Sequence, residues 1–200
     1  MDAANDAAKA GVPTEIPGDI AADPLWQAIS EYAFDRGGTV YKFVDRLARE
    51  QGWPRLYAEA AIGEYRRFCY LAGKADHVVV PSDAVDQVWH LHLLYSEDYW
   101  DVFCADVLGR KFHHAPSRGG ATETLEMRQL YAKTLSAYAE IFTTPPPPAF
   151  WPETSERFMY SGRYRRVDMW NYVTIPRLDK PKRIGLMICA IGLIIAIITF

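Results

Sequence analysis

The chain has 200 residues, a formal net charge of −3 and hydrophobic side chains at 50% of its positions. This length and composition predict one folded domain with a core of ordinary size and some additional tail. The small net charge gives no overall basic footprint, so we expect no nucleic-acid partner. The 3 cysteines are far apart and include no CxxC pair, which argues against a disulfide framework or a zinc knuckle.

The first 22 residues differ in composition from the rest of the chain. Residues 1–22 are small and polar, and glycines and prolines interrupt them. No apolar run follows a basic start, so this segment is not a secretory signal and we expect a disordered tail. The folded domain is predicted to begin at Asp23-Pro24, because aspartate is a preferred helix N-cap and proline a preferred first helical residue.

Apolar side chains recur at helical spacing through residues 23–152, and glycines follow most of the apolar runs. This periodicity predicts amphipathic helices. The expected fold class is all-α, a single helical bundle domain of about five helices. The helices are expected between residues 24 and 37, 39 and 52, 53 and 73, 82 and 108, and 122 and 142.

The expected helix over residues 82–108 and the loop after it hold four of the 5 histidines. At about 100° per residue, His92 lies on the apolar face of this helix. Asp86 and His90 lie together on a different, polar face. His90 and His92 therefore point about 200° apart, and an unbroken helix cannot give both to one metal ion.

Asp86 and His90 are four residues apart and are predicted to form half of a site for a divalent transition metal such as zinc. His113 or His114 would supply the rest, and the sequence does not choose between them. From His90 to Leu108 the helix climbs about 27 Å, whereas the five or six residues that follow return at most about 20 Å. The two halves therefore meet only if the chain doubles straight back or the helix ends early.

Each histidine also has a structural explanation. His92 fits a core imidazole bonded to a neighbour such as Ser96 or a tyrosine, and His90 fits a solvated ring or one paired with Asp86. His77, just before the helix, is an alternative partner for His90. No catalytic residue and no cofactor-binding residue is assigned. The candidate metal ligands are Asp86, His90, His92, His113 and His114.

The C-terminal segments predict a membrane anchor. Residues 153–183 form a basic linker, and residues 184–200 contain no charge and no proline. At 1.5 Å per residue the apolar segment reaches about 26 Å, enough for a short transmembrane helix. We expect it to tether the chain to a membrane as a single-pass tail anchor. The basic flank predicts that the soluble domain is cytoplasmic.

The run Val85-Asp86-Gln87-Val88-Trp89-His90-Leu91-His92 is followed by Tyr99, Gly109 and His113-His114. This pattern resembles the VDxxWHxH stretch of the glycine-rich-domain-containing-protein-like family, a domain of unknown function, over residues 24–152. The resemblance implies a helical domain without an established activity. It singles out Asp86, His90, His92 and one of His113 or His114 as the matching polar positions. The glycine-rich tail behind the family name is absent from this chain.

Three functions of different classes fit these observations. The first is a membrane-tethered cytoplasmic helical domain that binds a protein partner. The second is a metal-dependent enzyme or metal sensor that uses Asp86, His90 and His113 or His114. The third is a small-ligand module with a pocket walled by Trp89, His92 and Tyr99. Convergence of the imidazoles within about 4–5 Å would favour the second, and whether the chain is an enzyme stays open at this point.

Overall fold

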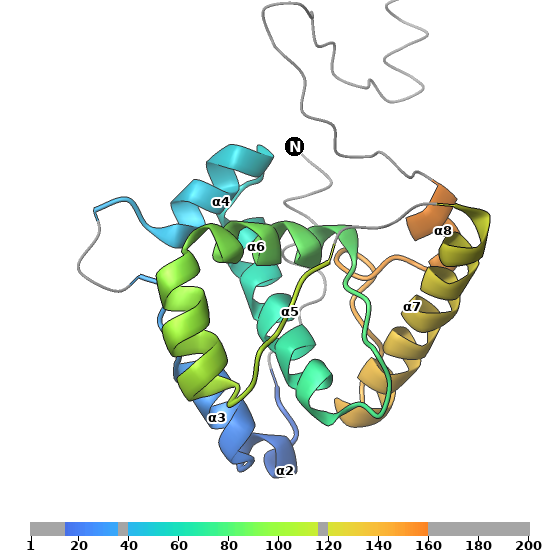
Figure 1. Ribbon diagram of the computed structural model, residues 1–200, viewed down its shortest axis with the longest axis horizontal. Helices are drawn as coiled ribbons and strands as arrows, with labels where there is room; N and C mark the ends of the chain where they lie inside the picture. The colour runs from blue at the N-terminus through green and yellow to red at the C-terminus, as the bar shows by residue number, and fades with distance from the viewer. Residues whose placement is uncertain (1–14, 36–39, 116–119, 160–200) are drawn as a thin grey trace, which may run out of the picture. The chain divides into compact units, whose positions relative to one another are not determined.

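The computed structural model describes residues 15–35, 40–115 and 120–159 (Figure 1). The regular secondary structure of these residues is helical, and no strand occurs among them. The chain runs through α2 (Gly18–Ala21), α3 (Pro24–Glu31), α4 (Phe43–Gln51), α5 (Arg55–Lys74), α6 (Asp83–Leu94), the π-helix η2 (Asp98–Val107), α7 (Ala121–Ile141) and α8 (Thr154–Met159).

The helix α5 is the centre of the domain, and α3, α4, α6 and α7 all pack against it (Figure 1). Its apolar residues recur at helical spacing, so the side chains of Ala61, Tyr65, Phe68 and Leu71 are fully buried. Burial of this apolar face against the neighbouring helices stabilises α5.

The start of α3 is as the sequence predicts, with Asp23 as N-cap and Pro24 as the first helical residue. The Asp23 carboxylate accepts a hydrogen bond from the Leu25 N–H at 2.9 Å. Two short helices lie outside the expected five. The helix α2 falls within the expected tail and buries Ile20, and α8 falls at the start of the expected linker.

The expected helix over residues 82–108 is two helices. The first, α6, ends at Leu94, and Tyr95 leaves the helical conformation with φ −87° and ψ 56°. After this break η2 takes a different direction (Figure 1). Packing explains the break, because α6 contacts α4 and α5 whereas η2 contacts α3, and one straight helix cannot reach all of them. The ring of Tyr95 lies 5.5 Å from that of Phe43 on α4, between their centroids, which secures the corner.

A buried polar network ties α7 and the chain after it to α5. One carboxylate oxygen of Glu64 accepts hydrogen bonds from the Tyr138 hydroxyl at 3.0 Å and the Trp151 indole N–H at 2.8 Å. The other oxygen accepts one from Arg67 at 2.8 Å. Burial raises the pKa of Glu64, and Arg67 opposes this shift. Each polar group of the network has a partner, as buried groups require.

The prediction of a C-terminal transmembrane helix is corrected. None of the helices in the described ranges is long and apolar enough to cross a membrane. The two longest, α5 with 20 residues and α7 with 21, are amphipathic and carry charged side chains. The segment 184–200, on which the prediction rests, lies outside the described residues. The tail-anchored, single-pass description thus has no support from the part of the chain that the structure describes.

Candidate metal centre

The first half of the candidate site comes from one turn of α6. Ser82 caps this helix by accepting a hydrogen bond from the Val85 N–H at 3.2 Å. Val85 and Trp89 face the core, so Asp86 and His90 lie on the outer side. The His90 Nε2 atom is 3.7 Å from Asp86 Oδ2, which is the pairing that the four-residue spacing predicts.

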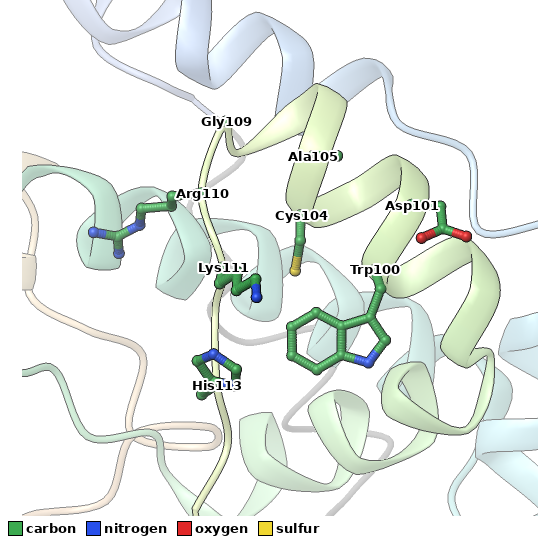
Figure 2. Close-up of a pocket in the computed structure, with 8 residues that line it drawn as sticks. All are labelled: Trp100, Asp101, Cys104, Ala105, Gly109, Arg110, Lys111 and His113. Carbon is green, nitrogen blue, oxygen red and sulfur yellow. The ribbon is translucent and has the colours of Figure 1, made fainter.

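The second half comes from the extended segment after η2. Gly109 has φ 62°, a left-handed conformation that glycine adopts without strain, and the chain reverses there. The segment then runs back beside η2 (Figure 2). The early end of α6 at Leu94 removes the difficulty of reach, because the returning chain follows η2 and meets the side of α6 directly.

Four contacts link α6, η2 and the returning segment. The Trp89 indole N–H donates to the Tyr99 hydroxyl at 2.9 Å, and this hydroxyl donates to the Phe112 carbonyl at 2.5 Å. The Phe112 ring stacks on Trp89 with centroids 4.3 Å apart and planes 12° apart. The His114 ring then meets Trp89 edge-on at 4.5 Å. Tyr99 therefore fixes the position of His114 along the axis of α6.

These contacts bring Asp86, His90 and His114 together. The His114 Nε2 atom lies 2.7 Å from Asp86 Oδ1, and the His90 and His114 ring centroids are 4.6 Å apart. One ligand atom from each of the three residues lies within 4.8 Å of the other two. We call these three residues the His–Asp–His cluster.

The cluster is closed on the protein side and open to solvent on the other. The side chains of Asp86 and His114 are 22% and 19% exposed, whereas that of His90 is 50% exposed. Two imidazoles and one carboxylate are donors that suit zinc and other divalent transition metals. A metal ion binds an imidazole nitrogen in place of a proton. The His114 nitrogen that is hydrogen-bonded to Asp86 is therefore the atom that would bind the ion.

The structure does not bring His92 to the cluster. This ring is 1% exposed, and its two nitrogens bond the hydroxyls of Tyr32 at 2.9 Å and Tyr65 at 3.0 Å. Burial, aided by the charge of Arg66, lowers the pKa of His92 to about 3, so the ring is neutral at ordinary pH. Of the structural explanations for His92, bonding to tyrosine is the one observed.

The remaining histidines also lie apart from the cluster. His113 follows the alternation of an extended segment and faces away from His114. Its ring lies 5.2 Å from Trp100 on η2. His77 Nδ1 lies 3.0 Å from the carboxylate of Asp76. The structure thus places His114, and neither His113 nor His77, beside His90.

The predicted ligand pocket is absent from the described residues. Trp89, His92 and Tyr99 are all at most 5% exposed and fill the core rather than wall a cavity. Sequence reasoning also missed the role of Tyr99 as the link between Trp89 and Phe112. The spacing of residues in the sequence does not predict that link, because it joins α6, η2 and the returning segment across the break at Tyr95.

A family model described as UCP032817-like matches residues 27–131, just over half of the 200-residue chain. The chain belongs to the UCP032817-like family. No curated protein matches the chain, and no solved structure does.

The UCP032817-like match contains the whole candidate site. Residues 27–131 include the His–Asp–His cluster, the buried His92 and the positioning residue Tyr99. The family description names no activity, so the function must be argued from the geometry of the cluster. The name of the glycine-rich-domain-like family, to which the sequence bears a resemblance, stays a prediction.

Proposed function

We propose that this UCP032817-like domain binds one divalent transition metal ion, with zinc as the best fit, through Asp86, His90 and His114. The observation that carries the proposal is the approach of three ligand atoms, from two segments of the chain, to within 4.8 Å of one another. An ion held by these three residues would supply Lewis-acid chemistry, the activation of a bound water, as in metal-dependent hydrolases.

The number of ligands and the open side support a catalytic rather than a structural site. Structural zinc sites take four protein ligands and are closed, whereas catalytic sites take three and leave one position for water or substrate. The cluster offers three, and the half-exposed ring of His90 stands at the solvent side.

The distances between the ligand atoms can be compared with those around a bound ion. Two ligands at about 2.0–2.1 Å from a tetrahedral ion stand about 3.4 Å apart. The His90 and Asp86 atoms at 3.7 Å are already near this separation. The His114 and Asp86 atoms at 2.7 Å must move apart as the proton between them leaves.

The residues around the cluster hold His114 and the start of α6 in place. His114 packs edge-on against Trp89, and its segment hangs from the Tyr99 hydroxyl. Such outer contacts orient the imidazole before the ion arrives. Ser82 caps α6 one turn before Asp86 and holds the start of the helix.

The protein-binding function stays a prediction that no observation of the structure favours. The large apolar side chains that are exposed in the described ranges come from six different segments rather than one helix face. They are Val40 and Tyr41, which are neighbours, and Leu56, Val78, Leu94, Leu125 and Met159.

The metal function is tested by calorimetric titration of the full chain, purified without a histidine tag and stripped with a chelator. We expect one Zn²⁺ to bind with a Kd of about 1 μM or tighter. His114→Ala and His90→Ala should each weaken binding by at least about 100-fold, since they remove ligands rather than outer partners.

His113→Ala is the matched control, because it removes a neighbouring imidazole that faces away from the cluster. It should bind Zn²⁺ as the parent does. The absence of Zn²⁺ binding by the parent, or an equal loss in His113→Ala and His114→Ala, would overturn the proposal.

A further inference from the structure

A second site lies on the other side of the segment that carries His114. A cavity of about 490 Å³ stands between η2 and the chain from Gly109 to His113 (Figure 2). This volume is within the range of small-molecule sites. Trp100 and Cys104 line it from η2, and Lys111 and His113 line it from the returning segment, where the His113 ring lies 5.2 Å from that of Trp100.

Successive side chains of the extended segment point to opposite sides, toward α6 or toward the cavity. Phe112 and His114 pack against Trp89 on α6. Lys111 and His113 are displaced by one residue and so face the other way, into the cavity. Two neighbouring histidines of the sequence therefore belong to two different sites.

The walls combine a flat apolar surface with positive charge. The Trp100 ring lies toward the middle of the cavity, beside the thiol of Cys104 (Figure 2). Burial raises the pKa of that thiol, so Cys104 acts as an apolar wall. Within the described ranges, no ion pair joins Lys111 to a carboxylate, and Figure 2 shows its ammonium directed into the cavity.

The other two charged residues of the lining are Arg110 and Asp101. The Arg110 guanidinium donates to the carbonyl of Ala72 on α5. The Asp101 carboxylate lies on the far side of Trp100 from Lys111 in Figure 2. Lys111 therefore supplies the positive charge beside Trp100, with the His113 imidazole two residues along the same segment.

We propose that this cavity binds a small planar organic anion of the aromatic carboxylate class. Its ring would lie against Trp100, and its carboxylate would accept hydrogen bonds from Lys111 and His113. Aromatic faces attract flat apolar ligands, and a charged donor fixes the orientation of an anion. The proposal uses none of the metal ligands and stands whether or not a metal binds.

The test is calorimetric titration of the full chain with 2-naphthoate, with EDTA present so that no metal can hold the carboxylate. We expect a Kd below about 1 mM. Lys111→Met should weaken binding by about threefold to fivefold, as expected for a partly exposed ion pair. The parent should bind the neutral isostere 2-naphthamide more weakly than 2-naphthoate by the same factor. Trp100→Leu should bind both compounds more weakly than the parent does.

Lys133→Met is the matched control, because Lys133 is an exposed lysine on α7. It should leave the affinity for 2-naphthoate unchanged. Failure of 2-naphthoate to bind the parent below about 1 mM would overturn the proposal. So would equal affinities for the parent, Lys111→Met and Trp100→Leu, because the anion would then occupy another place.

Discussion

Two histidines that stand two residues apart on α6 occupy opposite environments. The His90 side chain is 50% exposed and faces Asp86 and His114. The His92 ring is 1% exposed and lies among aromatic side chains of the core. The cause is the helical turn of about 100° per residue, which separates the two side chains by about 200°. The phase on the helix, rather than the spacing in the sequence, thus decides which imidazole is available for chemistry.

The hydrogen bonds of the two rings differ as their exposure does. Both nitrogens of His92 are taken by the hydroxyls of Tyr32 and Tyr65, and no ion can replace them without unpairing buried groups. The Nε2 atom of His90 lies 3.7 Å from a carboxylate oxygen of Asp86, and its side chain is 50% exposed. We therefore expect substitutions of His92 to act on folding and substitutions of His90 to act on metal binding.

The largest effect is expected from His92→Leu. The change leaves the Tyr65 hydroxyl without its imidazole partner and disturbs that of Tyr32, which also bonds Asp98. Each buried polar group that loses its partner costs about 1–3 kcal/mol, so the free energy of unfolding should fall by about 2–4 kcal/mol. Urea unfolding followed by circular dichroism measures it.

His90→Leu is the matched change on the exposed side of α6. It should alter the free energy of unfolding by about 0.5 kcal/mol or less, as exposed substitutions do. Equal losses in the two variants would show that helical phase does not separate the roles of the two rings.

The next effect is on the pH dependence of stability. The pKa of His92 is about 3 in the fold and about 6.5 in the unfolded chain. Between these values the unfolded state binds the extra proton, so the contribution of His92 is complete above pH 6.5. It is lost as the pH falls toward 3, at about 1.4 kcal/mol for each pH unit. Urea unfolding at pH 7 and pH 5 should show this slope in the parent.

The control for that slope is the same measurement on His92→Leu, which keeps Arg66, Asp98 and the other charged groups around the ring. Its stability should fall less between pH 7 and pH 5 than that of the parent, by about 2 kcal/mol. Identical slopes would mean that other groups carry the acid sensitivity.

The smallest effect is expected from Tyr99→Phe, which tests how His114 is positioned. The change removes the hydroxyl that links Trp89 to the Phe112 carbonyl. The affinity for Zn²⁺ should fall by about tenfold, in the range typical of outer partners. Tyr95→Phe is the control, because its hydroxyl makes no hydrogen bond within the described ranges. Unchanged Zn²⁺ affinity in Tyr99→Phe would remove Tyr99 from the site.

The sequence predicts the helices and half of the site for simple reasons. Apolar periodicity and the cap at Asp23 locate the elements, because both depend on neighbouring residues. The pairing of Asp86 with His90 follows from one turn of a helix. Such features need no knowledge of tertiary structure.

The other half of the site depends on contacts between distant segments. The break at Tyr95 has no local signal such as glycine or proline, and it arises because Tyr95 packs on Phe43 while η2 turns to α3. Only this break lets the returning segment bring His114 beside Asp86. The choice of His114 over His113 depends in turn on Phe112 stacking on Trp89, which sets the alternation of the segment.

The measurement that tests the metal centre most directly is anomalous diffraction at the zinc edge from crystals grown with Zn²⁺. We expect one strong peak about 2.0–2.2 Å from a carboxylate oxygen of Asp86 and from the Nε2 atoms of His90 and His114. A peak at His113 or His77 alone, or none beside Asp86 at saturating Zn²⁺, would contradict it.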